Sequence, residues 1–186
     1  MDLKSCRNLW IYIKSLILNK VGMSINSSHY VKLHFLATVF NKLGNFDMTR
    51  FDGRLIFQKT VYFLQAFKIY MGYNFSLYIH GPYSPDLAKD GFELKDKIGQ
   101  IKDEIQFPSE ESKKSFDVFL SFIDKIKDQP DDLETLASLH LFHKLFPTDS
   151  KNMIIQRVLY HKPYLQKGTC EESWKILENF GLVQTK

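Results

Sequence analysis

Three side chains that can transfer protons or attack as nucleophiles lie within five residues: His80, Tyr83 and Ser84. A turn at the end of a strand can project such side chains into a cleft, where a histidine acts as acid or base and a serine as nucleophile. The nearest acids that could orient the histidine are Asp86 and Asp90, and no Gly-x-Ser-x-Gly elbow occurs in the sequence. We therefore predict no catalytic residues and keep an enzyme centred on His80 as an alternative.

Two further histidines, His140 and His143, are three residues apart and would share one face of a helix. Glu134 and His161 are the nearest additional ligands, and there is no His-Glu-x-x-His pattern. Glycine-rich phosphate loops of the two common types are also missing. We expect neither a metal site nor a cofactor, and a polar helix face is the preferred interpretation of the histidine pair.

Several polar residues lie on a segment that is apolar on nearly every side. Arg54, Gln58 and Gln65 fall on roughly one side of this segment, with Tyr62 between them and Lys59 next to Gln58. A helix this apolar must be buried, so its polar groups need hydrogen-bond partners. We predict a buried clamp that holds the backbone of residues 80–84, and a ligand site is the alternative.

The elements that position these residues can be predicted from periodicity. Apolar residues at helical spacing predict a helix over 28–43, which Gly44 ends. A second helix, capped by Thr49 or Asp52, is predicted to run to Met71 and to form the centre of the fold.

A short strand is predicted over 75–79, where aromatic residues alternate with small or polar ones. Gly81-Pro82 is expected to break it, and Ser84-Pro85 is typical of a helix start. Residues 99–108 form a polar connector that includes a potential second strand near 101–107.

Four more helices are predicted over residues 109–128, 131–146, 150–161 and 170–180. Asp131 with Glu134, and Thr169 with Glu172, have the spacing of capping boxes, and Gly181 closes the last helix. The predicted fold is α+β and mainly α, with about seven helices packed around a central apolar helix and a short strand or small sheet.

Residues 152–183 follow a helix, turn, helix order that is typical of helix-turn-helix units. The second helix carries Glu171, Glu172 and Glu178 against Lys175 alone. Because a recognition helix meets phosphates, this acidity argues against direct DNA reading by the C-terminal unit.

Length and charge constrain the class of protein. A chain of 186 residues, 44% hydrophobic, suits one domain. Residues 1–75 hold 10 Lys and Arg against 3 Asp and Glu, whereas residues 76–186 hold 15 against 18. The basic half supports a nucleic-acid-binding regulator as an alternative function. The two cysteines, Cys6 and Cys170, form no disulfide framework, so we predict a cytoplasmic location.

The N-terminal residues 1–22 are predicted to be an appendage, with translation starting at Met23 as an alternative. The apolar run over residues 9–18 is interrupted by Lys14 and is shorter than the roughly 20 residues that span a bilayer, so no membrane association is expected. Residues 23–186 are predicted to form a single domain.

The residues that carry a family resemblance are Arg54-Leu55, Gln58-Lys59, Tyr62-Phe63-Leu64-Gln65, Tyr78, His80-Gly81-Pro82-Tyr83-Ser84, Leu87 and Asp90. This pattern resembles the core of the YwgA-like proteins and the related Panacea-domain (SocA/GepA-like) antitoxins, and it extends loosely over residues 28–183. The resemblance implies a mainly helical α+β domain without established catalysis, whose relatives act as antitoxins or adaptors by binding another protein. The chain departs from the pattern at residues 57–60, where many relatives have Leu-Gln-Lys-Leu, and at His80, where an aromatic residue is common.

The leading functional hypothesis is a non-enzymatic, antitoxin-like or adaptor module that presents residues 78–84 to a protein partner, such as a toxin. The oligomeric state stays open. The residues expected to form the partner-binding or structural motif are Arg54, Gln58, Lys59, Tyr62, Gln65, Tyr78, His80, Gly81, Pro82, Tyr83, Ser84 and Asp90.

Overall fold

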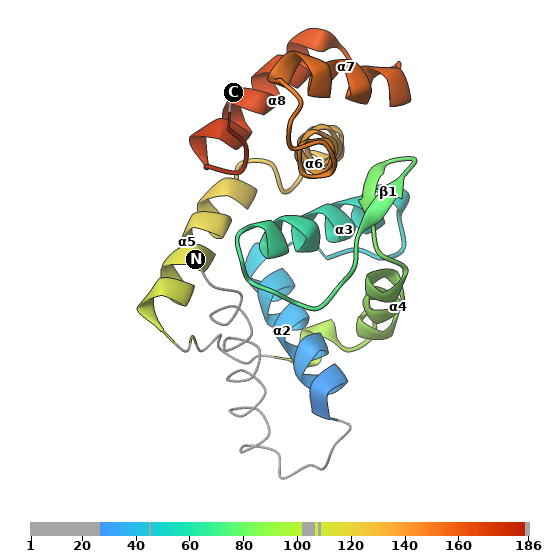
Figure 1. Ribbon diagram of the computed structural model, residues 1–186. Coiled ribbons are helices and arrows are strands. Elements are labelled where there is room, and N and C mark those ends of the chain that lie inside the picture. Colours follow the sequence, from blue (N-terminus) through green and yellow to red (C-terminus); the bar gives the residue numbers. More distant parts are fainter. Residues whose placement is uncertain (1–26, 45, 102–106, 108, 185–186) are drawn as a thin grey trace.

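The computed structural model describes residues 27–44, 46–101, 107 and 109–184. Within these ranges it has seven α-helices, one 3₁₀ turn and one two-stranded antiparallel sheet, which confirms the predicted mainly helical fold (Figure 1). The elements are α2 (Ser27–Leu43), α3 (Phe51–Ala66), β1 (Ser76–Tyr78), β2 (Gly81–Tyr83), α4 (Pro85–Leu94), η1 (Ile98–Gln100), α5 (Glu110–Ile123), α6 (Pro130–Leu145), α7 (Lys151–His161) and α8 (Lys167–Asn179). In these ranges, none of the helices combines the length and apolar character needed to cross a membrane.

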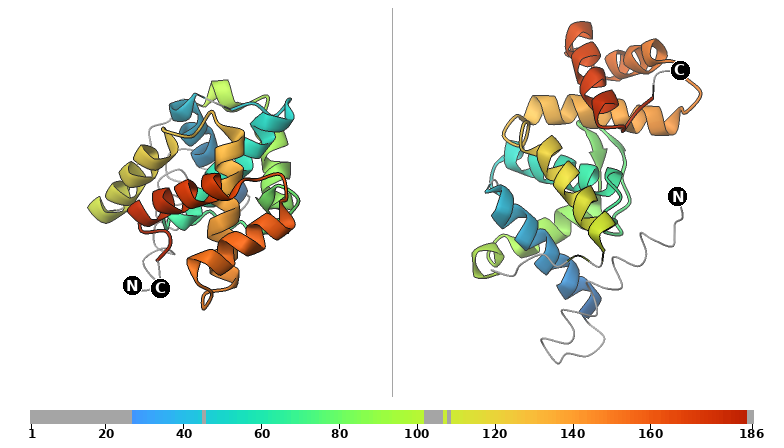
Figure 2. Two further views of the ribbon diagram at one scale, coloured as in Figure 1. Left: turned by 90° about the horizontal axis from the view of Figure 1, so that it is seen from above. Right: turned by 90° about the vertical axis from the view of Figure 1, so that its left-hand side faces the viewer.

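Helices α3 and α6 lie at the centre of the molecule and pack against each other. On its other side α6 contacts α7 and α8, whereas α3 contacts α4 and α5 (Figures 1 and 2). The hairpin of β1 and β2 lies beside both central helices, with β2 in contact with each of them. The predicted central helix is therefore one of a central pair.

The two central helices are buried on every side. Residues 55–64 of α3 and residues 133–142 of α6 are all buried, so each helix has ten consecutive residues without an exposed position. An all-round buried helix must satisfy its polar side chains internally. Those polar side chains are Gln58, Lys59 and Thr60 in α3, and Glu134, Thr135, Ser138 and His140 in α6. Among the described residues, the Thr60 and Ser138 hydroxyls have no hydrogen-bond partner.

The end of α3 differs from the prediction. The helix ends at Ala66 and not at Met71, because Lys68 adopts a left-handed conformation with φ of 69°. The Ile69 amide then donates to the Leu64 carbonyl at 3.1 Å, which gives the Schellman pattern of hydrogen bonds. Since glycine usually occupies this left-handed position, a lysine there carries no stop signal in the sequence.

The start of α3 also differs. Its N-cap residue is Arg50, whose side chain makes no capping hydrogen bond, so neither Thr49 nor Asp52 is the N-cap. The Thr49 amide and hydroxyl instead bond the Asp47 carboxylate, at 2.8 and 2.6 Å. These contacts order the loop that leads into the helix.

The predicted strand ends before Gly81-Pro82 as expected, since β1 stops at Tyr78. The sequence did not predict that residues 81–83 form the second strand of a hairpin. Ser76 pairs with Tyr83, Leu77 with Pro82 and Tyr78 with Gly81. Proline has no N–H to donate to a neighbouring strand, and the Pro82 carbonyl bonds a lysine of α3 instead. The potential second strand near 101–107 falls mainly on residues 102–106, outside the described ranges, and Ile101 and Phe107 belong to no strand.

Serine residues cap three helices as their positions suggest. Ser84 accepts the Leu87 amide at the start of α4, and Ser109 and Ser150 do the same for α5 and α7. The two predicted capping boxes are wrong. Helix α6 begins at Pro130 after Gln129, whose side chain makes no capping hydrogen bond, so Asp131 lies inside the helix. The Glu134 carboxylate bonds Lys162 instead of the start of the helix.

Helix α8 begins at Lys167, three residues before the predicted Cys170, so Thr169 lies inside the helix. The backbone bond from the Cys170 amide to the Gln166 carbonyl, 3.1 Å, closes its first turn. At the other end Gly181 has φ of 68° and terminates the helix as predicted. The predicted appendage 1–22 and the alternative start at Met23 concern residues outside the described ranges.

Candidate functional site

Gln58 holds the segment that follows the hairpin through both groups of its side-chain amide. Its Nε2 donates to the Ser84 carbonyl at 2.9 Å, and its Oε1 accepts the Ser84 amide at 3.0 Å. Both bonds are buried, so removing the glutamine would leave the Ser84 amide without a partner, while the Ser84 carbonyl would keep its bond from the Ala88 amide. The predicted clamp is therefore confirmed for Gln58.

The other two members of the predicted stripe bond different segments. Gln65 accepts the amides of Met71 and Tyr73 at 3.0 Å and donates to the Tyr73 carbonyl at 2.9 Å. Arg54 donates to the carbonyl of Thr49 at 2.9 Å, on the N-terminal side of α3. The prediction that these side chains bond residues 80–84 was wrong, because helical spacing identifies the face they share but not the loop that lies against it.

Gly81 fits the hairpin closely against α6. Its φ is 86°, and a Cβ atom at this position would lie 2.7 Å from the Ser138 hydroxyl oxygen. Gly81 and Pro82 are buried, whereas Tyr78 and Ile79 are exposed. One strand of the hairpin therefore faces the protein core, and the other strand and the turn face outward.

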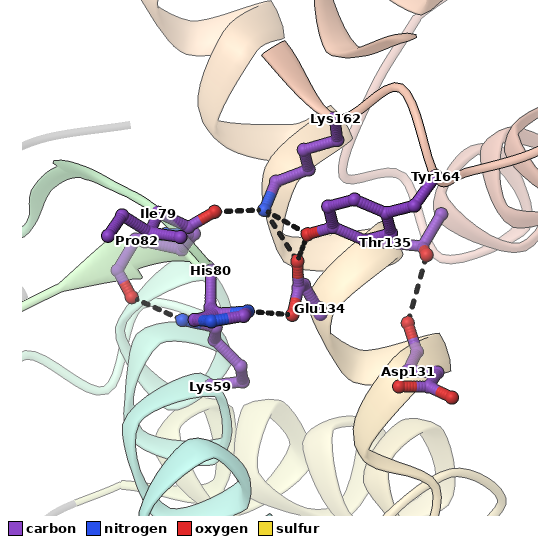
Figure 3. A network of polar contacts seen from close by, with 9 residues as sticks. All are labelled: Lys59, Ile79, His80, Pro82, Asp131, Glu134, Thr135, Lys162 and Tyr164. Atoms are coloured by element: carbon purple, nitrogen blue, oxygen red, sulfur yellow. Dashed lines mark hydrogen bonds and ion pairs between the residues drawn. The ribbon is translucent and has the colours of Figure 1, made fainter.

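An ionic network centred on the buried pair of Glu134 and Lys162 joins the hairpin, α6 and the segment after α7 (Figure 3). The carboxylate of Glu134 contacts Lys162 Nζ at 2.5 Å and His80 Nδ1 at 2.8 Å, and it also accepts the Tyr164 hydroxyl. Lys162 Nζ donates in addition to the Ile79 carbonyl at 2.6 Å. Burial alone would raise the pKa of Glu134, but the hydrogen bonds from Lys162 and Tyr164 lower it below its usual value.

Lys59 lies beside this network and is only 2% exposed. Its ammonium donates to the Pro82 carbonyl at 2.7 Å (Figure 3). Burial lowers the pKa of Lys59 to about 7, with the positive charge of Lys162 acting in the same direction and the attraction of Glu134 opposing it. The Lys59 side chain therefore changes its charge near neutral pH.

A cavity of about 200 Å³ opens between the hairpin, α3 and α4. Its polar lining comes from Arg54, Gln58, Lys59 and His80, and Glu134 does not line it. The rest of the lining is apolar or aromatic: Met48, Phe51, Leu55, Tyr78, Gly81, Tyr83, Ala88 and Phe92. The cavity thus combines basic groups with an apolar wall.

The predicted residues Asp90 and Tyr62 lie elsewhere. Asp90 is buried, accepts the Tyr73 hydroxyl at 2.6 Å and lies 3.5 Å from Lys32 Nζ. The Tyr62 hydroxyl lies 2.7 Å from Nδ1 of His140 in the core. Neither residue lines the cavity with His80. The hydroxyl of Ser84 is occupied at the start of α4, so His80, Ser84 and Asp90 do not assemble into a catalytic group.

Of the two histidines of α6, His140 is buried in the protein core. Burial lowers the pKa of His140 to about 3, with smaller effects of Lys144 and His143, so its ring is neutral at ordinary pH. Across the described ranges, no group of three or more His, Cys, Asp or Glu side chains is arranged to hold a metal ion.

Sequence reasoning missed the roles of five residues. Glu134 was expected in a capping box of α6. Lys162 and Tyr164 were not expected at a site, because Lys162 reaches the hairpin carbonyl of Ile79 from 83 residues away and Tyr164 reaches Glu134 from 30 residues away. Phe51 and Phe92 were missed as members of the cavity wall. Lys162 is only 1% exposed, which is rare for a lysine, but this burial is a property of the fold that the sequence does not show.

Comparison of the chain with protein-family models, with curated proteins and with solved structures finds no match. The fold and the site together define a mainly helical α+β domain with a fixed hairpin beside a basic cavity.

Proposed function

We propose that this protein is a non-enzymatic interaction module, of the antitoxin or adaptor type, that binds a protein partner through the outer surface of its hairpin. Four large apolar side chains at this surface carry the proposal. Phe51, Tyr78, Ile79 and Phe92 are 52, 58, 66 and 53% exposed, and three of them line the cavity. Exposed aromatic residues around a depression are typical of the centre of protein interfaces.

The hairpin is held rigidly from inside. Gln58 fixes the residue after β2, Lys59 bonds Pro82, and Lys162 bonds the carbonyl of the turn residue Ile79. A surface that is ordered before binding loses less conformational entropy when the partner arrives. The inner contacts therefore support binding by the outer face.

The antitoxin part of the proposal depends on the resemblance of residues 54–90 to the Panacea-domain proteins. The same residues include Gln58 and Lys59, which fix the hairpin, and Tyr78, which lies on its outer face. The motif thus contains both the support and the surface that a binding module requires.

Site-specific photocrosslinking in the native host tests the partner. A photoreactive phenylalanine analogue at position 78 should capture one dominant protein, whereas the same analogue at Tyr160, which is 84% exposed on α7, should not capture it. Adding Phe92→Ala should reduce the crosslink at position 78. The proposal would be overturned if positions 78 and 160 gave the same crosslinked products. It would also be overturned if this protein captured no partner and bound DNA in a salt-sensitive way.

The antitoxin type is tested by growth. Expression of the gene that neighbours this one should arrest growth, and coexpression of this chain should restore it. If expression of the neighbouring gene caused no growth defect, the antitoxin function would be rejected and the adaptor function would remain.

A further inference from the structure

We propose that the cavity between the hairpin, α3 and α4 is a binding site for a carboxylate attached to an apolar body. The ligand's carboxylate would meet Lys59 and Arg54, and its apolar body would lie against the aromatic wall. The proposal goes beyond the protein-binding function and does not depend on it.

The charge of the cavity lining favours an anion. Among the described residues, three basic side chains, Arg54, Lys59 and His80, line it together with no aspartate or glutamate. The carboxylate of Glu134, which bonds His80 of the lining, is already engaged with Lys162 and the Tyr164 hydroxyl as well. When Lys59 is protonated, the buried group formed by Lys59, Lys162 and Glu134 has two cations for one anion. One additional negative charge would balance it.

The hydrogen bonds of Lys59 also favour an added acceptor. An ammonium has three N–H donors, and the part of the chain that the structure describes supplies Lys59 with one acceptor, the Pro82 carbonyl. A buried donor without an acceptor destabilises the protein. A ligand carboxylate would supply acceptors and hold Lys59 in its charged form.

The size and wall of the cavity define the rest of the ligand. Its volume of about 200 Å³ is below the roughly 300–1,000 Å³ of cavities that hold drug-sized molecules, so it suits one ring or one short aliphatic chain. Phe51, Leu55 and Phe92 supply an apolar wall for such a group. Such a ligand has two sources, a free monocarboxylic acid or the C-terminal residue of a peptide.

Titration calorimetry with paired probes tests the proposal. The free-acid pair is 3-phenylpropionate and 3-phenylpropionamide, and the peptide pair is acetyl-Gly-Phe with a free or an amidated C-terminus. In at least one pair the acid should bind about tenfold or more tightly than its amide, the factor expected from one charge-assisted hydrogen bond. The pair that shows the difference identifies the source.

Two variants and a pH series complete the test. Lys59→Met should remove the preference for the acid, whereas Lys89→Met, at an exposed position of α4, should leave it unchanged.

Because Lys59 loses its proton near pH 7, the acid should bind about tenfold more weakly at pH 9 than at pH 6, and the amide should bind equally at both. Any of three results would overturn the proposal. Acid and amide could bind equally, neither acid could show saturable binding, or the preference for the acid could survive Lys59→Met. None of these results would affect the crosslinking at position 78.

Discussion

At the scale of single residues, Lys59 opposes folding in the absence of a ligand. Its pKa falls from 10.5 in the unfolded chain to about 7 in the folded protein, so the unfolded chain binds more protons between these values. The destabilisation is fully present below pH 7, decreases as the pH rises, and disappears above about 10.5. Its size at low pH is on the order of a few kcal/mol.

Lys59→Met should therefore stabilise the protein. We expect a gain of about 1–3 kcal/mol in the free energy of unfolding at pH 6, and a clearly smaller gain at pH 9, measured by urea unfolding. Lys89→Met, at an exposed position, serves as the control and should change neither value by more than about 0.5 kcal/mol. A loss of stability at pH 6 would show that the bond to Pro82 outweighs the cost of burying the charge.

Gln58→Ala should have the opposite effect. It leaves the buried amide of Ser84 without its partner, whereas the Ser84 carbonyl keeps its bond from the Ala88 amide at 3.1 Å, so we expect a loss of about 1–3 kcal/mol in the free energy of unfolding. Gln100→Ala, which removes an exposed and long hydrogen bond, provides the comparison by urea unfolding. If both variants lost the same stability, the clamp would not support the fold.

These residues also show what the sequence can predict at this scale. The burial of Gln58 and its need for a backbone partner followed from its place on an apolar helix, and the structure confirms both. The partners of Gln65 and Arg54 did not follow, because spacing fixes a direction on the helix and not the loop in that direction. Tyr164 could not be assigned, since it reaches Glu134 across 30 residues of intervening chain.

At the scale of elements, the conformation of Lys68 makes the end of α3 a point of strain. A residue other than glycine in the left-handed conformation costs about 1–2 kcal/mol. Replacing it with glycine removes this cost, but the greater freedom of glycine in the unfolded chain offsets part of the gain in stability. Lys68→Gly should therefore stabilise the protein by about 0.5–1 kcal/mol in thermal or urea unfolding. Gly72→Ala, at φ of 76° with open space around it, is the reverse experiment and should destabilise the protein. A gain from both changes would contradict the assignment of strain.

Secondary structure was predictable where serine or glycine marked a boundary and not where other residues did. Ser84, Ser109 and Ser150 start helices as expected, and Gly181 ends one. The ends of α3 and the start of α6 lack such residues, so tertiary contacts decide them. The second strand was missed because Gly81-Pro82 usually interrupts strands, whereas here Gly81 packs against Ser138 and the Pro82 carbonyl bonds Lys59.

At the scale of the whole molecule, the Glu134 network connects three parts that are distant in the sequence. Lys162 follows α7, Glu134 lies on α6, and the carbonyl of Ile79 belongs to the hairpin. The network thus attaches the C-terminal helices to the surface that we propose as the partner-binding face (Figures 1 and 3). Because Lys162 and Glu134 are both buried, removing one charge leaves the other without its main partner.

A double-mutant cycle measures this connection. Lys162→Met and Glu134→Leu should each destabilise the protein by about 3–5 kcal/mol in urea unfolding, and the double variant should lose clearly less than the sum of the two. Hydrogen exchange in the Lys162→Met variant should also become faster at the amides of residues 78–81, because the Ile79 carbonyl loses its bond to the C-terminal unit. The control is Lys167→Met, which removes an exposed ion pair with Glu171 in α8. Additive losses with unchanged exchange in the hairpin would mean that the C-terminal helices and the hairpin are stabilised independently, and that the network does not transmit order to the outer face.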